Sequence, residues 1–223
     1  LGQVGTPAIA ALSQCLSSDS AKKRSGAARA LGEMESESVA NLLVIALRDP
    51  DGDVRVAAVS ALGRLELEVV VKDLLTLLND SDWKVRHHVA LVLERYGSSV
   101  SSRLNRGLTI VLQKGRTSEA VELARLLGRI GDGSSAESLR SGLLSEFAPV
   151  RVACAWALGE IQDCVVVPGL VDALDDVNSK VCREAAVALG KISNSSARPA
   201  LLRCLENTLK GSQLGDMVLS LRS

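Results

Sequence analysis

Aromatic residues and histidines are scarce in this chain. Phe, Trp and Tyr together make up 2% of the 223 residues, and there are two histidines. A single large core without aromatic anchors is unusual, whereas stacked helices rich in Ala, Leu and Val need few of them. Hydrophobic residues still reach 47% of the chain. This composition argues against one compact core and favours a repeated helical architecture.

Long apolar runs and an excess of either charge are also missing. No segment approaches the roughly 18 uninterrupted apolar residues that span a bilayer, and no basic-then-apolar leader opens the sequence. Basic and acidic side chains number 26 each, so no net charge steers the chain toward nucleic acid or anionic lipid. We therefore expect a cytoplasmic protein without membrane insertion, for which nucleic acid is not the favoured partner.

The usual arrangements of catalytic and metal-binding residues are absent from the sequence. His87 and His88 are adjacent, so on a helix they point about 100° apart and do not share a face as metal ligands would. No phosphate-binding G-x-x-x-x-G-K loop is present. The cysteines have no paired metal spacing and are interpreted as reduced thiols; they are Cys15, Cys154, Cys164, Cys182 and Cys204. We expect no cofactor, no metal and no catalytic residue, and hence not an enzyme.

The sequence does contain an internal repeat. A leucine recurs every 31 residues, with one interval of 34 residues, at Leu31, Leu62, Leu93, Leu127, Leu158 and Leu189. All but Leu93 are followed by glycine. A fixed period of this length indicates one supersecondary unit copied along the chain, each copy burying its apolar face against its neighbours.

A second series of leucines predicts a second helix in each unit. The leucines come in pairs four residues apart, which places both on one helical face; the first members are Leu12, Leu43, Leu74, Leu108, Leu139, Leu170 and Leu201. We expect second helices such as 38–47, 68–78 and 165–174. The glycine after the leucine of each first helix is expected to end that helix in the left-handed conformation. Each unit is thus predicted to be a helical hairpin.

The segment 49–63, Asp-Pro-Asp-Gly-Asp-Val-Arg-Val-Ala-Ala-Val-Ser-Ala-Leu-Gly, and its echo at 148–159 resemble HEAT repeats, specifically the short HEAT-like class of phycobilin lyases. The likeness runs from Leu1 to a partial unit near 213–221. It implies an all-α fold: a right-handed α-solenoid of stacked hairpins, HEAT-like or armadillo-type. We expect a single array over 1–223, divided as 1–18 (partial), 19–49, 50–80, 81–114, 115–145, 146–176, 177–209 and 210–223 (partial). Both ends look cut, which is compatible with a longer array or with self-association through the ends.

The resemblance also implies an internal ladder in which Asp and Arg side chains pair between adjacent units. A forked guanidinium suits a carboxylate and turn carbonyls in this role. Cys182 and Ala120 stand where arginine is expected and so break the ladder. The ladder residues are predicted to be Asp49, Arg55, Asp80, Arg86, Arg151 and Asp176.

The favoured functional hypothesis is a non-catalytic scaffold or adaptor that binds another protein or peptide along the concave face formed by the second helices. Residues two before the later leucine of each pair should face outward there. Mixed polarity with Ile45 and Ile110 exposed is typical of a protein-binding groove. The predicted partner-binding residues are Asn41, Ile45, Arg48, Lys72, Thr76, Asn79, Arg103, Arg106, Ile110 and Gln113.

Two alternatives remain open. The repeat class suggests a phycobilin lyase-like or chaperone-like role, although the scarcity of aromatic residues does not support it. The other alternative is nucleic-acid binding through a central basic patch around Arg103 and Arg106, where Lys114 and Arg116 also lie.

Overall fold

The computed structural model describes residues 5–34, 36–65 and 70–210. All regular elements within these ranges are helices, which confirms the predicted all-α fold of helical hairpins. The beginning of the predicted helix 68–78 and nearly all of the partial unit 210–223 lie outside the described residues. The chain divides into two compact units, Leu1–Val100 and Ser101–Ser223. This division falls inside the predicted hairpin 81–114.

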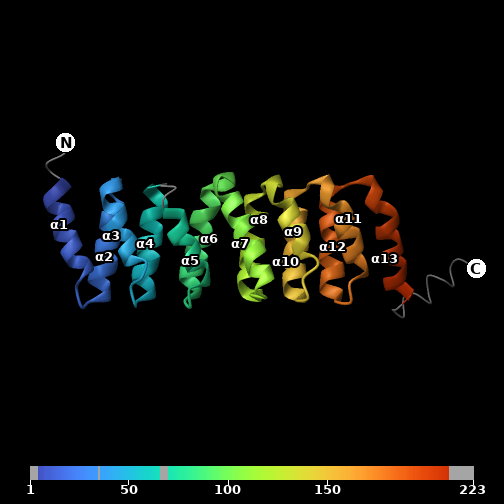
Figure 1. Cartoon of the computed structure of the whole chain (residues 1–223), viewed down its shortest axis with the longest axis horizontal. Coiled ribbons are helices and arrows are strands. Elements are labelled where there is room, and N and C mark those ends of the chain that lie inside the picture. Colours follow the sequence, from blue (N-terminus) through green and yellow to red (C-terminus); the bar gives the residue numbers. More distant parts are fainter. Residues whose placement is uncertain (1–4, 35, 66–69, 211–223) are drawn as a thin grey trace, which may run out of the picture. The chain divides into compact units, whose positions relative to one another are not determined.

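The first unit is built from four longer helices and the short second helices between them. Helices α2, α4 and α6 pack side by side, and α1 and α3 pack against α2 and α4 (Figure 1). The described elements are α1 Gly5–Leu16, α2 Ala21–Gly32, η1 Glu37–Val39, α3 Ala40–Ala46, α4 Gly52–Leu65, α5 Val71–Thr76, η3 Leu77–Asn79, α6 Trp83–Arg95 and η4 Gly97–Val100.

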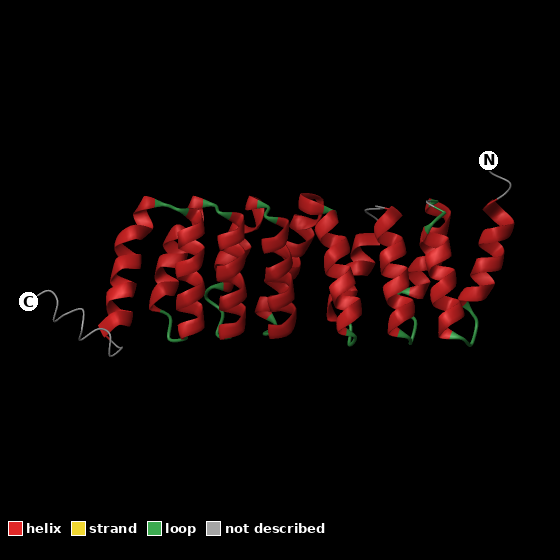
Figure 2. Ribbon diagram, turned by 180° about the vertical axis from the view of Figure 1, so that it is seen from behind, coloured by secondary structure: helices red, strands yellow, loops and turns green. Residues whose placement is uncertain are grey.

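The second unit follows the same plan. Helix α10 packs between α8 and α12, while α7, α9 and α11 form the layer of second helices. The connections are short loops at the helix ends (Figure 2). The elements are α7 Ser101–Gln113, α8 Thr117–Ile130, η5 Gly133–Ser135, α9 Ala136–Gly142, α10 Ala148–Ile161, η6 Cys164–Val166, α11 Val167–Asp172, η7 Ala173–Asp175, α12 Ser179–Ile192, η8 Ser195–Ala197 and α13 Arg198–Lys210.

The periodic leucines form the core of both units. Those of the first helices, from Leu31 to Leu189, are all buried. Those that open each pair on the second helices are fully buried from Leu43 to Leu170. Because a buried leucine contributes about 1.5–3 kcal/mol relative to an exposed one, this repeated burial is what holds the hairpins together.

The expectation for the glycine after each first-helix leucine is wrong. These glycines lie within or at the end of their helices, and it is Gly131, Gln162 and Ser193 that adopt positive φ angles of 70°, 58° and 53°. A Cβ on Gly128 or Gly159 would lie 2.8 Å from the Cα of an alanine in the next first helix. At Gly32, Gly128 and Gly159 the glycine is required because it meets the backbone of the next first helix, whereas a Cβ on Gly190 would meet nothing within 4 Å.

Helices α3, α5 and α11 are shorter than the predicted ranges, because 3-10 turns take the place of one or both of their end turns. Helix α9 covers only Ala136–Gly142 and comes after the 3-10 turn η5. In the second unit these turns begin with a side-chain cap: Asp132, Asp163 and Asn194 each accept a hydrogen bond from the N–H two residues later. Such caps satisfy donors that the start of a helix leaves without partners.

An Arg–Asp ladder joins successive hairpins. Arg24 pairs with Asp49 and Arg55 with Asp80, each across 25 residues and with two hydrogen bonds of 2.7–2.8 Å. Arg151 pairs with Asp176 in the same way. A third guanidinium nitrogen of each arginine donates to the carbonyls five and six residues before it.

The predicted ladder residue Arg86 and the predicted break at Cys182 differ from this pattern. Arg86 keeps the bonds to the carbonyls of Asp80 and Ser81, but no Asp or Glu occurs in the segment 111–116 that corresponds to its expected partner. At Cys182 the thiol takes the place of the guanidinium and lies 3.0 Å from the carbonyl oxygen of Asp176. The ladder is therefore continuous through residues 24–80 and resumes at residues 151–176.

Candidate functional site

All ten side chains predicted to bind a partner are solvent-exposed. They divide between the two compact units. Six lie on or beside the second helices α3 and α5 of the first unit, with Ile45 69% exposed: Asn41, Ile45, Arg48, Lys72, Thr76 and Asn79. The other four lie on α7 of the second unit, with Ile110 43% exposed: Arg103, Arg106, Ile110 and Gln113.

Gln113 at the end of α7 lines a hollow that the sequence pattern does not predict. A depression of about 500 Å³ separates the end of α7 from the end of α9 and the turn after it. It is open to solvent, so it suits a side chain or segment of another molecule better than an enclosed small ligand. Its lining residues are Thr109, Leu112, Gln113, Ser141, Leu144, Ser145, Glu146 and Phe147.

Two apolar side chains stand exposed at the rim of this hollow. Leu144 is 86% exposed, and Phe147, the single phenylalanine of the chain, is 36% exposed. The position of Leu144 is taken by Arg48, Asn79 and Asp175 in other repeats. This replacement of a polar residue by leucine is the sequence signal that would have identified the site.

Phe147 occupies a position that normally caps a helix. It is the N-cap of α10 and makes no side-chain cap hydrogen bond. The side chains of the equivalent Asp82 and Asn178 accept hydrogen bonds from the backbone N–H groups of Lys84 and Lys180, at 2.9 and 3.0 Å. Replacing such a cap typically costs about 0.5–2 kcal/mol. Pro149, two residues after Phe147, has no N–H to donate to such a cap, so this position can carry an aromatic ring without losing that hydrogen bond.

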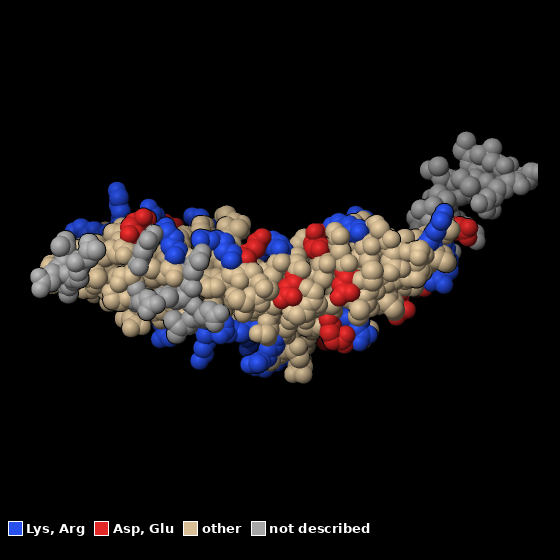
Figure 3. Space-filling model, turned by 90° about the horizontal axis from the view of Figure 1, so that it is seen from above, with Lys and Arg blue, Asp and Glu red and all other residues tan. Residues whose placement is uncertain are grey.

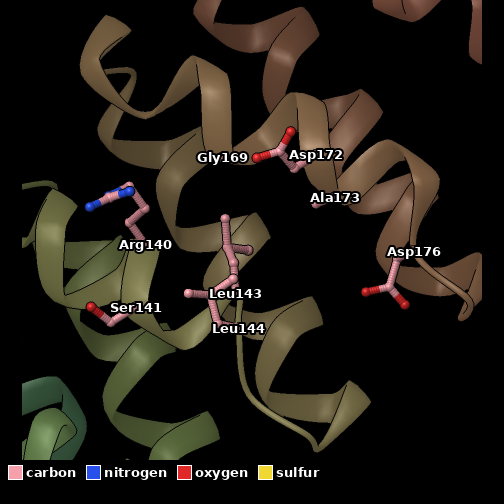
Figure 4. Close-up of a pocket in the computed structure, with 8 residues that line it drawn as sticks. All are labelled: Arg140, Ser141, Leu143, Leu144, Gly169, Asp172, Ala173 and Asp176. Atoms are coloured by element: carbon pink, nitrogen blue, oxygen red, sulfur yellow. The ribbon is translucent and has the colours of Figure 1, made fainter.

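A second hollow adjoins the first on the other side of α9. It holds about 200 Å³ between α9 and α11, and Leu144 lines both hollows. Figure 4 shows Leu143 and Leu144 between Arg140 and Ser141 on one side and Gly169 and Asp172 on the other. A Cβ on Gly169 would lie 3.3 Å from Cγ of Arg140. The missing side chain at Gly169 is therefore part of why this space exists.

The charged groups around the second hollow are mostly neutralised. Arg140 donates two hydrogen bonds to Glu137, at 3.0 and 2.7 Å, and these bonds hold the pKa of Glu137 below its ordinary value. The pairing of Asp176 with Arg151 likewise lowers the pKa of Asp176. Asp172 is exposed, and within the described residues its carboxylate has no hydrogen-bond or ion-pair partner.

The described residues include no cluster suited to a metal, and their buried thiol is unreactive. They contain no group of three or more His, Cys, Asp or Glu side chains that could hold a metal ion. Burial raises the pKa of the Cys154 thiol to about 12, which keeps it protonated and unreactive near neutral pH. Among the described helices, none is long and apolar enough to cross a bilayer.

Basic side chains do not form one continuous surface in the view of Figure 3, where Lys and Arg are interspersed with Asp and Glu. In the predicted basic patch on α7, Arg103 and Arg106 are exposed. The next second helices, α9 and α11, carry the acidic residues Glu137 and Asp172 instead. A nucleic-acid groove would present a stripe of one sign.

Comparison with known proteins identifies the family. The profile of HEAT repeats matches residues 39–106, 105–188 and 136–211, and that of the PBS lyase HEAT-like repeat matches residues 23–49. These matches cover most of the chain, which therefore belongs to the HEAT-repeat family. The predicted resemblance is confirmed. No curated protein sequence matches significantly.

Several solved structures are similar to the chain. One is the complex of CpcE and CpcF of phycocyanin lyase from Nostoc sp., with 23% identity, a TM-score of 0.46, and coverage of 96% of this chain and 92% of that chain. Human deoxyhypusine hydroxylase in complex with glycerol has 22% identity, a TM-score of 0.38, and coverage of 83% and 84%. A designed armadillo repeat protein has 16% identity, a TM-score of 0.39, and coverage of 82% and 99%.

Proposed function

We propose that this protein is a non-catalytic scaffold that binds another protein through the exposed surface of its second helices. In the second unit the binding site is centred on Leu144, between the two hollows. In the first unit the corresponding surface is the row of six exposed residues that contains Ile45 and Lys72.

One observation carries the proposal: Leu144 is 86% exposed beside a hollow of about 500 Å³ whose rim also holds Phe147. A large apolar side chain exposed next to a concavity, with polar residues around it, is typical of a protein-interaction site. The mixed signs of charge nearby agree with a protein partner.

The test is capture of partners from the native source by the wild-type chain and by single variants. Leu144→Ser should abolish capture of a partner that uses the second unit, and Ile45→Ser that of a partner using the first. Val165→Ser is the matched control, because Val165 is also exposed, at 70%, and lies in η6 at the other end of a hairpin of the same unit. Equal capture by all four proteins would exclude both surfaces.

A bilin-related role is the second candidate, since the PBS lyase HEAT-like repeat profile matches residues 23–49. Adding a free bilin and recording its visible spectrum distinguishes the two proposals. A shifted spectrum that survives Leu144→Ser would favour a bilin site elsewhere on the chain, and an unchanged spectrum would remove this candidate.

A further inference from the structure

The two hollows lie on either side of α9, and this arrangement says more about the partner than exposure alone does. The first hollow lies between α7 and α9, the second between α9 and α11. Leu144 lines both, so one continuous ligand can occupy the two hollows while touching the same leucine. The chemistry of the two hollows therefore specifies the partner of the proposed scaffold, on whose function this inference rests.

The first hollow selects an apolar side chain. Leu112, Leu144 and Phe147 supply apolar surface to its lining, and Glu146 is the single ionisable residue among its described lining residues. Phe147 also approaches the adjacent turn, since a Cβ on Gly115 would lie 3.7 Å from its Cε2 atom. An aliphatic or aromatic side chain placed here would cover both exposed apolar groups.

The second hollow selects a positive charge. Arg140 is bound to Glu137 by two hydrogen bonds, and Asp176 is bound to Arg151 by two more. Among the described residues of the lining, this leaves the exposed Asp172 as the uncompensated charge. The basic residues Arg106 and Lys114 belong to α7 and the turn after it, on the far side of the first hollow, and line neither space.

The spacing of the helices sets the spacing along the ligand. Neighbouring packed helices lie about 8–10 Å apart. A peptide in the polyproline II conformation has about three residues per turn and advances about 3.1 Å per residue, so side chains three positions apart lie on one face, about 9 Å from each other. Side chains that enter adjacent hollows therefore belong to residues about three positions apart in such a segment.

We propose that the α7, α9 and α11 surface binds a segment of a partner protein in the extended polyproline II conformation, with an apolar side chain against Leu144 and Phe147 and a lysine or arginine about three residues away paired with Asp172. This pairing fixes the direction in which the segment lies across the helices.

The probe is a display library of random linear peptides, selected on the full chain. Peptides from the wild type should share an apolar residue and a Lys or Arg at a fixed short spacing, and Leu144→Ser should abolish their binding. For an exposed pair, Asp172→Asn should weaken binding by about two- to fivefold. Asp163→Asn is the matched control, because asparagine caps a helix as well as aspartate does and Asp163 lies at the other end of a hairpin.

A double-mutant cycle makes the test specific. Replacing the basic residue of a selected peptide by alanine should weaken binding to the wild type and have no further effect on Asp172→Asn. Peptides whose binding is lost in Leu144→Ser, but which carry no basic residue or carry one at no fixed spacing, would overturn the inference. They would still support the scaffold function. Peptides insensitive to both Leu144→Ser and Ile45→Ser, or no selected peptides, would overturn the inference and the scaffold function alike.

Discussion

The carboxylate of Asp80 accepts hydrogen bonds from Nε and Nη2 of Arg55 at 2.8 and 2.7 Å, across 25 residues of the sequence. The same arginine donates through Nη1 to the carbonyls of Asp49 and Pro50, at 2.7 and 3.1 Å. One side chain thus joins the turns of two successive hairpins. The Arg55 side chain is 12% exposed and that of Asp80 7%, so solvent cannot replace these bonds.

Replacing Asp80 by asparagine should lower the free energy of unfolding by about 2 kcal/mol, because it leaves a largely buried guanidinium without its counter-charge. Urea denaturation measures the change. Asp53 is the control, since its side chain is 72% exposed and Asp53→Asn should cost less than about 0.5 kcal/mol. Equal losses for the two variants would mean that the ladder is not stabilising.

The same ladder predicts a loss of stability in acid. Hydrogen bonds from Arg24 and Arg151 hold the pKa values of Asp49 and Asp176 below the ordinary value of 3.8. The unfolded chain therefore takes up protons at a higher pH than the folded chain, so this stabilisation is complete above the unfolded pKa and is lost as the pH falls through the folded pKa. Urea midpoints measured from about pH 6 down to 3 should decrease more steeply for the wild type than for Arg151→Met. Parallel pH curves for the wild type and Arg151→Met would contradict the role given to the ladder in acid.

Two glycines of α2 should respond in opposite ways to alanine. A Cβ on Gly32 would lie 2.8 Å from Cα of Ala61, whereas a Cβ on Gly26 meets nothing within 4 Å. Gly32→Ala should destabilise by about 1–3 kcal/mol through overpacking, and Gly26→Ala should stabilise by about 0.5–1 kcal/mol through helix propensity. Thermal denaturation of the two variants checks the difference. A stabilised Gly32→Ala would show that the helices can separate without cost.

Phe147→Asn should make the protein more stable and less able to bind. Asparagine can cap α10, although Pro149 at its start has no N–H to donate, so we expect a gain of about 0.5 kcal/mol. Partner capture, or binding of selected peptides, should fall at the same time. Unfolding and binding are measured on the same preparation, with Asn178→Ala as the reference for losing a real cap. A variant with lower stability and unchanged binding would contradict the role given to Phe147.

The cysteines should separate into two classes in a thiol-labelling experiment. Cys15 and Cys164 are exposed, whereas Cys154 is buried and its pKa is raised to about 12 by that burial. Near neutral pH, Cys154 should therefore react only after unfolding, while Cys15 and Cys164 react in the folded protein. Mass spectrometry of labelled peptides with and without urea gives the answer. Rapid labelling of Cys154 in the folded state would contradict the packing of α10.

The hairpins could be predicted from the sequence because leucines repeated at a fixed period indicate one location, the contact between helices. Leu62 and Leu74 are both fully buried at such contacts. The function of the glycines was predicted wrongly. A glycine at the end of a helical stripe is compatible with a helix end or with close packing of helices, and only the approach of the neighbouring backbone distinguishes the two.

The candidate site was only partly predictable. Ile110 and Gln113 are exposed, as their helical positions predict, and Gln113 lines the first hollow. Leu144 was missed although it stands at the repeat position of the predicted Arg48 and Asn79, because the prediction was confined to the units before it. Phe147 was missed because helical periodicity carries no information about the turn before α10. The hollows could not be predicted, because they depend on the absence of a side chain at Gly169 and on the placement of two turns.

The glycine contact between first helices also limits how such a protein can evolve. At Gly159 the spacing of neighbouring hairpins is set by backbone and methyl groups, which have no room to vary. The second helices carry no such constraint on their outward side, where leucine, arginine, asparagine and aspartate alternate at one position. Mutation can therefore give the array a new specificity while its pitch stays the same.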